Sequence, residues 1–210
     1  MTEEVKESKC IILKGDNQFD YGSKPVPELK EKEVLIKVIA APINPSDVYL
    51  IAGTYPTSKK HPLVPGIEGA GQVVKSGGGQ IGKGLVGKKV AFAAEGNGPF
   101  GTYSQYTIVQ EHMCIVLEEE TSCEQGSMSF INPLTVYFML EQLKENKLNS
   151  VVHTAGNSQL GRMMTKYFGE NGVDVISIVR KKEQIELLQK EVGAKYVLNS
   201  SDPDFEKQFQ

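Results

Sequence analysis

The chain has 210 residues, with 23 basic and 26 acidic side chains, which gives a formal net charge of −3. Hydrophobic residues make up 40% and charged residues 23%, the balance of an ordinary globular protein that can bury a sizeable core. A slightly acidic chain has no general field that attracts phosphate backbones, so we expect no nucleic-acid partner. No apolar run approaches the ~20 residues that span a bilayer, so we expect no membrane partner either.

The cysteines and the N-terminal sequence give information about the cellular compartment of the protein. Cys10, Cys114 and Cys123 are an odd number of cysteines without metal-type spacing, which favours reduced thiols in an intracellular protein. The start, MTEEVKESKC, lacks the apolar region of a secretory signal and the Arg- and Ser-rich pattern of a mitochondrial presequence. We therefore expect a cytoplasmic protein, with a trimmed mitochondrial protein as the alternative.

The first part of the chain, up to about residue 123, is predicted to consist of short strands between turns. Residues 34–40 are a β-branched run that two prolines follow closely. Further strands are predicted at residues 71–74, 89–92 and 103–109. Short strands separated by Gly and Pro turns are typical of a compact, rolled-up β domain.

The second part alternates between helices and strands. Apolar spacing predicts helices over residues 133–143, 160–168 and 181–192. Short apolar runs predict strands at residues 150–154, 173–179 and 196–198. After the first helix the order is β-α-β-α-β, which is typical of a parallel sheet with crossover helices. We expect an α/β protein with a β-rich domain over residues 1–125 and an α/β domain over residues 126–210.

The first strand of the second part runs directly into a candidate phosphate-binding turn and then into a helix. Its residues are Ala155, Gly156, Asn157, Ser158, Gln159, Leu160 and Gly161. A dinucleotide fold needs small residues here, because the strand turns sharply and the backbone approaches the pyrophosphate, which the helix dipole and free N–H groups attract. The pattern is A-x-x-S-x-x-G, with Ser158 where a glycine is usual and the bulky Gln159 beside it. An ordinary glycine-containing loop is the alternative, but the order of the elements favours a dinucleotide site.

The end of the second strand bears on which cofactor is bound. Arg180, Lys181 and Lys182 follow this strand, where an NAD site usually places Asp or Glu and an NADP site an Arg for the 2′-phosphate. The alternative is a solvated helix start with ordinary surface charges, although three cations in a first helical turn would oppose the helix dipole. The three residues favour NADP(H) over NAD(H).

With these motifs, the sequence resembles the medium-chain dehydrogenase/reductase superfamily over nearly its whole length. The resemblance is carried by residues 41–47 (APINPSD), 53–56 (GTYP), 65–71 (PGIEGAG), 132–135 (NPLT) and the turn at 155–161. It is most similar to the zinc-free 2-enoyl thioester reductase-like and quinone oxidoreductase-like branches. The resemblance implies a GroES-like β-barrel followed by a Rossmann NADP(H)-binding domain, with the active site between the two.

A metal site is not expected. The zinc-dependent relatives use a Cys near the turn that contains Asn44 and a His before the Glu of Gly-His-Glu, whereas here the turn has no Cys and Ile67 stands at the His position. The four-cysteine structural site of those relatives is also missing, and the three histidines of the chain do not cluster with cysteines. A catalytic zinc needs about three protein ligands.

Without a metal, the resemblance implies hydride delivery from the cofactor and a hydroxyl that stabilises or protonates the developing enolate. Tyr55 matches the position of the family's catalytic tyrosine, and Asn44 would orient the substrate or the nicotinamide. Asn132 and Thr135 match a motif that contacts the cofactor. The alternatives are an aromatic turn residue for Tyr55 and a helix N-cap before a proline for Asn132. Tyr103 is expected to pack in the core.

The resemblance also implies a second half of the Rossmann domain, which would hold the nicotinamide and which these 210 residues do not include. We therefore expect a fragment of an NADPH-dependent enoyl thioester reductase-like oxidoreductase that acts on a small molecule. The alternatives are a quinone or alkenal oxidoreductase and a non-catalytic interaction subunit. An exposed sheet edge after Leu198 would need a second copy, a protein partner or the tail at residues 205–209 to cover it.

Overall fold

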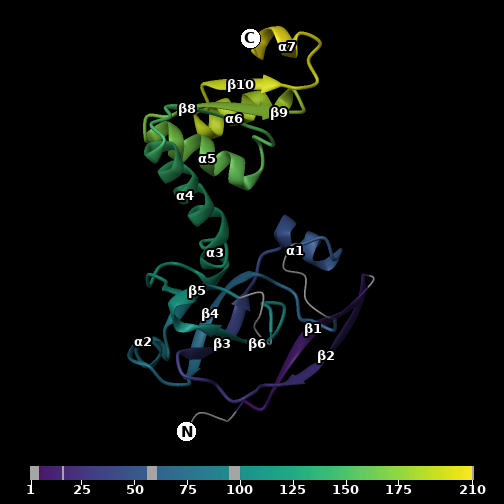
Figure 1. Ribbon diagram of the computed structural model, residues 1–210, viewed down its shortest axis with the longest axis vertical. Coiled ribbons are helices and arrows are strands. Elements are labelled where there is room, and N and C mark those ends of the chain that lie inside the picture. Colours follow the sequence, from purple (N-terminus) through teal and green to yellow (C-terminus); the bar gives the residue numbers. More distant parts are fainter. Residues whose placement is uncertain (1–4, 16, 56–60, 95–99, 210) are drawn as a thin grey trace. The chain divides into compact units, whose positions relative to one another are not determined.

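The computed structural model describes residues 5–15, 17–55, 61–94 and 100–209. The chain divides into two compact units, Met1–Ile131 (unit 1) and Asn132–Gln210 (unit 2). Figure 1 shows that unit 1 consists mainly of strands, whereas unit 2 is a small sheet with helices packed on it. The division at Ile131 lies close to the domain boundary between residues 125 and 126 that the sequence predicted.

Unit 1 contains two antiparallel groups of strands with short helices in the connections. Its elements are β1 (Glu7–Gly15), β2 (Gln18–Pro25), β3 (Glu33–Ala40), α1 (Pro45–Ile51), β4 (Glu68–Ser76), α2 (Gln80–Leu85), β5 (Lys89–Ala93), β6 (Tyr106–Gln110), the 3-10 helix η1 (Glu111–Met113), β7 (Cys114–Val116) and α3 (Cys123–Gly126).

The larger group is a five-stranded sheet with the order β6-β3-β4-β5-β7, and β1 and β2 form a separate hairpin. Isolated bridges join this hairpin to the rest of unit 1 at Cys10–Ser104 and Leu13–Leu63. Among the described strands, β6 does not pair with β7, so hydrogen bonds do not close a complete barrel. The main core of unit 1 lies on this sheet and includes Val34, Ile36, Val73, Val90, Phe92 and Val109.

Unit 2 is a parallel sheet with helices on it. Its elements are α4 (Ile131–Glu145, which begins with the last residue of unit 1), β8 (Ser150–His153), α5 (Gln159–Glu170), β9 (Asp174–Val179), α6 (Glu183–Val192), β10 (Tyr196–Asn199) and α7 (Phe205–Phe209). The strand order is β10-β9-β8, and both pairings are parallel. This confirms the predicted β-α-β-α-β arrangement of a partial Rossmann fold. Both β8 and β10 are edges of the described sheet, whereas the sequence had pointed only to the edge after Leu198.

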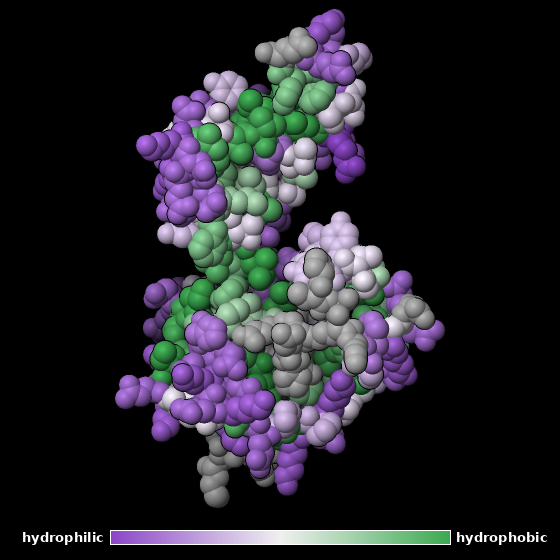
Figure 2. Space-filling model, viewed as in Figure 1, coloured by the Kyte–Doolittle hydropathy of each residue, from purple (hydrophilic) through white to green (hydrophobic). Residues whose placement is uncertain are grey.

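The core of unit 2 packs α4 and α5 against the sheet. Its buried members are Val136, Leu140, Met164, Phe168, Val173 and Val175, and a smaller cluster under α6 contains Val179, Leu188 and Ala194. The outer face of α4 is less polar than a typical helix surface, with Phe138 62% and Met139 41% exposed. Figure 2 shows hydrophobic side chains at the surface over this helix.

Four of the seven predicted strands lie inside observed ones, and the ends of the other predicted strands and of the helices differ by up to three residues. The helix expected at 133–143 begins at Ile131, and the helix expected from Lys181 begins at Glu183. The strand expected at 103–109 begins at Tyr106, because the residues before it bond to β1: the Ile11 N–H donates to the Tyr103 carbonyl and the Gln105 N–H to the Lys9 carbonyl. The hairpin β1–β2 and the helix α1 were missed.

Candidate functional site

The turn between β8 and α5 is sharp, as a phosphate-binding turn requires. The Gly156 N–H donates to the Ile178 carbonyl of β9 at 2.9 Å, and the Ser158 N–H donates to the Ala155 carbonyl at 2.8 Å. Ala155 has a φ of 54°, in the left-handed region that favours glycine. Such backbone strain clusters at functional sites, where the surrounding structure holds it in place.

Ser158, which stands where a glycine was expected, is the N-cap of α5. Its Oγ accepts a hydrogen bond from the Gly161 N–H at 3.0 Å, and its carbonyl accepts one from the Arg162 N–H at 2.9 Å. Gln159 and Leu160 occupy the first two helical positions, where an N–H group has no acceptor within the helix. Together with the helix dipole, these N–H groups favour an anion at this end of α5.

Gly156 and Gly161 permit close packing around the turn. A Cβ atom on Gly156 would lie 3.0 Å from the Ser177 Cβ. A Cβ atom on Gly161 would lie 2.6 Å from the Gly156 carbonyl oxygen, a distance that real Cβ atoms do not reach. Asn157 in the same turn has a buried Oδ1 without a hydrogen-bond partner among the described groups. A tight cradle and an unsatisfied polar atom are features that fit a polar ligand at this turn.

A cavity of about 670 Å³ opens beside the turn, at the carboxyl ends of the parallel strands. It is lined by Thr154, Ala155, Gly156, Asn157, Ser158, Ile178, Val179, Arg180, Gln184, Ser200 and Phe205. Open α/β sheets bind their ligands at this end of the strands. The cavity therefore brings together Arg180 and four residues of the turn, all of which the sequence had singled out.

Arg180 follows the last residue of β9. Its backbone is held by two hydrogen bonds, and its side chain is exposed. Its N–H donates to the Gln184 Oε1 at 3.3 Å, and its carbonyl accepts from the Ser201 hydroxyl at 3.0 Å. Its guanidinium forms no ion pair with the described residues. The structure corrects the argument from the helix dipole, because α6 begins after these cations, with Lys182 as its N-cap and Glu183 and Glu186 in its first turn.

The other predicted cofactor residues lie elsewhere. Gln159, Leu160, Gly161, Lys181 and Lys182 do not line the cavity beside the turn. Leu160 packs on the core of unit 2, so only its backbone can face a ligand.

The motif at the start of α4 is placed differently from the expectation. Asn132 lies inside the first turn of α4 rather than at its N-cap, because the helix begins one residue earlier, at Ile131. Thr135 lines a different, mostly apolar cavity of about 650 Å³ beside β8.

In unit 1, Tyr55 lies just after α1 and is half-buried. The N–H groups of Thr54 and Tyr55 both donate to the Tyr49 carbonyl, at 2.9 and 3.1 Å, which fixes the backbone at this point. The last residue of the GTYP motif, Pro56, lies outside the described residues. The structure does not place the Tyr55 hydroxyl against a hydrogen-bond partner among the described residues.

Asn44 belongs to a buried polar network at the start of α1. Its Nδ2 donates to the Glu68 Oε1 at 2.8 Å, and the Glu68 Oε2 accepts from the Ile131 N–H at 2.7 Å. Its own N–H donates to the Asp47 Oδ2 at 2.8 Å. Asn44 is only 8% exposed and Glu68 only 1% exposed. The sequence motifs contained Asp47 and Glu68, but nothing in their spacing indicated that they would meet Asn44.

Burial shifts the pKa values of two groups in this network. Burial raises the pKa of Asp47, although hydrogen bonding from the Asn44 N–H and other nearby groups opposes the shift. Burial, and then the negative charge of Asp47, raises the pKa of Tyr103. The Tyr103 hydroxyl donates to the Pro42 carbonyl at 3.2 Å, and the residue is half-buried, so it is not the simple core residue that the sequence predicted.

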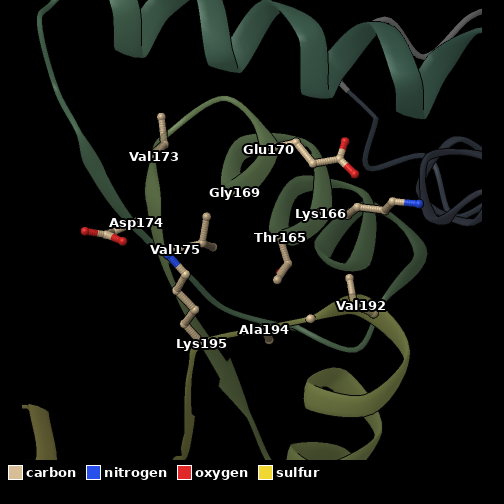
Figure 3. Close-up of a pocket in the computed structure, with 11 residues that line it drawn as sticks. Thr165, Lys166, Gly169, Glu170, Val173, Asp174, Val175, Val192, Ala194 and Lys195 are labelled. Carbon is tan, nitrogen blue, oxygen red and sulfur yellow. The ribbon is translucent and has the colours of Figure 1, made fainter.

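A smaller cavity lies at the opposite, amino end of the strands in unit 2 (Figure 3). Its volume is about 290 Å³, and its polar lining includes Thr165, Lys166, Glu170, Asp174 and Lys195. Ligands of open α/β sheets bind at the carboxyl ends of the strands, so this cavity is the weaker candidate for a cofactor site.

Among the residues that the structure describes, no three side chains of His, Cys, Asp and Glu gather closely enough to hold a metal ion. In the same part of the chain, none of the helices has the length and apolar character to cross a membrane.

Comparison with known proteins shows that this chain is similar to parts of proteins that are named reductases or oxidoreductases. Residues 30–119 match the family model of the alcohol dehydrogenase GroES-like domain. The mitochondrial enoyl-[acyl-carrier-protein] reductase of Rattus norvegicus is 32% identical over 177 residues, which are 81% of this chain and 46% of that protein. The chain thus spans about half the length of the curated relatives it matches.

Solved structures include proteins with the same fold as this chain. A candidate NADPH:quinone reductase of Mesorhizobium loti is 36% identical, with a TM-score of 0.88 over 99% of this chain and 64% of that one. A mycobacterial protein solved in complex with NADPH is 25% identical, with a TM-score of 0.77 over 93% of this chain and 59% of that one. The chain is thus similar to members of the medium-chain dehydrogenase/reductase superfamily, in the enoyl reductase-like and quinone oxidoreductase-like branches.

Proposed function

We propose that this chain binds NADP(H) in the cavity beside residues 155–158 and that it is part of an oxidoreductase that reduces an activated carbon–carbon double bond. One observation carries the proposal: the turn and Arg180 line the same cavity of about 670 Å³. The backbone N–H groups at the start of α5 would bind the diphosphate. The Arg180 guanidinium would bind the 2′-phosphate as a charged, planar donor.

When bound, the reduced nicotinamide would supply a hydride. Tyr55 would then serve as the proton donor or as the hydroxyl that stabilises the enolate. Asn44 would act through its carboxamide, whose Nδ2 donates to Glu68 and whose Oδ1 would orient a substrate or an amide group. Asn132 and Thr135 remain proposed cofactor contacts.

The proposed substrate is a 2-enoyl thioester. This proposal is supported by the curated relatives, which are named enoyl-[acyl-carrier-protein] reductases at about 30% identity. A quinone or enone is the second candidate, because one similar structure is described as an NADPH:quinone reductase. Oxidation of NADPH with a panel of enoyl thioesters, quinones and enones distinguishes the two substrate classes.

Two further proposals concern compartment and partners. Cytoplasmic location is proposed from the reduced thiols, and the mitochondrial relatives favour the alternative. Fractionation of cells separates the two compartments. A second copy or a protein partner is proposed to cover the open edges of the sheet at β8 and β10.

Replacing Arg180 tests the choice of cofactor. Arg180→Ala should weaken binding of adenosine 2′,5′-bisphosphate by about 1.5–3 kcal/mol, the contribution of a hydrogen bond to a charged group. Binding of adenosine 5′-phosphate, which lacks the 2′-phosphate, should not change. Isothermal calorimetry on both ligands measures the effect. The matched control is Lys195→Ala, which removes a cation of unit 2 at the opposite cavity. Equal affinity of Arg180→Ala and the unaltered protein for the 2′-phosphate ligand would leave no reason to prefer NADP(H).

Replacing Tyr55 tests the proposed proton donor. Tyr55→Phe should lower kcat by at least about tenfold, because proton transfer by a positioned group contributes ~10²–10⁴-fold. The melting temperature should not change, since the Tyr55 backbone bonds to Tyr49 are kept. The control is Tyr49→Phe on the neighbouring helix, whose ring is 59% exposed. If both variants turn over at the rate of the unaltered protein, Tyr55 is an aromatic turn residue only.

A further inference from the structure

A polar cluster lies directly beneath the phosphate-binding turn, between α5 and the sheet. His153 ends β8, and its register partner on β9 is Ser177, so the two side chains lie on the same face of the sheet. The His153 Nε2 lies 2.8 Å from the Ser177 Oγ. Thr165 reaches this pair from α5, with its Oγ1 2.9 Å from the Ser177 Oγ and 3.3 Å from the His153 Nε2.

The cluster ends on the backbone of the turn. The Thr165 hydroxyl donates to the Gly161 carbonyl at 2.8 Å. The Gly161 N–H donates to the N-cap side chain of Ser158. A Cβ added to Gly161 would collide with the Ala155 and Gly156 carbonyl oxygens. Figure 3 shows the Thr165 side chain on the inner side of α5. Thr165 and Ser177 are 5% and 0% exposed, so these bonds are largely shielded from bulk water.

With the Nε2–H tautomer of His153, the protons can be arranged in one direction that satisfies the three shorter contacts. The Gly161 carbonyl can only accept, so the Thr165 hydroxyl must donate to it. The Thr165 Oγ1 then accepts from the Ser177 hydroxyl, and the Ser177 Oγ accepts from the Nε2–H of a neutral His153. If the Ser177 proton pointed to the histidine instead, no proton would lie between the two hydroxyl oxygens. Burial lowers the pKa of His153, which keeps the ring neutral at neutral pH.

We propose that His153, Ser177 and Thr165 are positioning residues for the phosphate-binding turn. Their chain of hydrogen bonds, from the imidazole through two hydroxyls to the Gly161 carbonyl, fixes the first turn of α5 on the ends of β8 and β9. It thereby fixes the direction of the N–H groups that bind the diphosphate. This inference rests on the proposed cofactor site, and it assigns the role to groups that touch neither the cofactor nor a substrate.

A pair of substitutions at Thr165 separates a hydrogen-bonding role from a packing role. Thr165→Val keeps the shape of the side chain and removes the hydroxyl, whereas Thr165→Ser keeps the hydroxyl and removes a methyl group. We expect the valine variant to bind adenosine 2′,5′-bisphosphate about tenfold more weakly, the size of one lost hydrogen bond. The serine variant should retain the original affinity. The preference for the 2′-phosphate over adenosine 5′-phosphate should not change in either variant, since Arg180 is untouched.

Control variants distinguish a loss of nucleotide affinity from a loss of folded protein. Thr107→Val removes a fully buried threonine hydroxyl of unit 1, which donates to the Phe100 carbonyl at 3.1 Å, and it should leave binding unchanged. Ser177→Ala should act in the same direction as Thr165→Val, since it interrupts the same chain. Thermal unfolding of every variant shows whether a weaker affinity reflects a smaller folded fraction.

Nuclear magnetic resonance of the free protein supplies a readout that needs no ligand. The amide signals of Gln159, Leu160 and Gly161 should move in Thr165→Val and stay in place in Thr165→Ser. The opposite pattern, with binding and amide signals retained in the valine variant and lost in the serine variant, overturns the proposal. If the unaltered protein does not bind either nucleotide, the proposed function fails, and the amide signals alone then decide whether the chain of hydrogen bonds positions the turn.

Discussion

Gly161→Ala is expected to weaken binding of adenosine 2′,5′-bisphosphate and NADPH by about a hundredfold. The added Cβ would lie 2.6 Å from the Gly156 carbonyl oxygen and 2.7 Å from that of Ala155, and both are backbone atoms. Relief requires α5 to move away from the turn or the turn to open. Overpacking of this kind costs up to about 3 kcal/mol, which is about two factors of ten in an equilibrium constant. The displaced atoms are those around the proposed diphosphate site, so the loss is expected to appear in affinity.

The control for this substitution lies on the same helix. Gly169 is also in α5, but a Cβ added there would meet nothing within 4 Å. Gly169→Ala should bind nucleotide like the unaltered protein and gain up to about 1 kcal/mol of stability, since alanine favours a helix more than glycine does. Calorimetric titration and thermal unfolding of the two variants make the comparison. Undiminished binding by Gly161→Ala would mean that the close packing at the turn serves the fold and not a ligand.

The secondary structure of unit 2 was predicted well from the sequence, because each of its elements has a local sequence pattern. A short apolar strand, a turn of small residues and an amphipathic helix can each be identified within about fifteen residues. The turn between Ala155 and Ser158 and the position of Arg180 after β9 followed from that order alone, and the structure places them in one cavity. The start of α6 was predicted too early. The Gln184 side chain accepts from the N–H groups of Arg180 and Lys181, so these residues form a turn between β9 and α6 and do not belong to the helix.

The polar networks could not be predicted in the same way, because they depend on register between distant segments. Ser177 faces His153 only through the pairing of β8 with β9, and a shift by one residue would place the serine on the other face of the sheet. Likewise, Glu68 meets Asn44 from a separate strand, 24 positions away along the chain. The resemblance to a family singled out Asn44, but it gave no reason to expect a buried carboxylate as its partner.

The buried carboxylate of Glu68 is expected to contribute strongly to the stability of unit 1. Glu68→Gln is expected to lower the free energy of unfolding of unit 1 by about 2–3 kcal/mol. Glu68 is 1% exposed and accepts from two donors, the Asn44 Nδ2 at 2.8 Å and the Ile131 N–H at 2.7 Å. Glutamine has the same shape, but it replaces one acceptor oxygen by an NH₂ group that would face a donor. Hydrogen bonds to a charged group are worth about 1.5–3 kcal/mol, and a buried mismatch adds to the cost.

The measurement must be local, because a chain of two compact units does not have to unfold in one step. Amide hydrogen exchange in α1 and at the start of α4 should accelerate in Glu68→Gln, since Asn44 precedes the first helix and Ile131 begins the second. Exchange in α5 and α6 should not change. Glu119→Gln, at an exposed position of unit 1, is the matched control and should alter stability by no more than about 0.5 kcal/mol. If Glu68→Gln behaved like that control, the carboxylate would be replaceable by any acceptor of its shape.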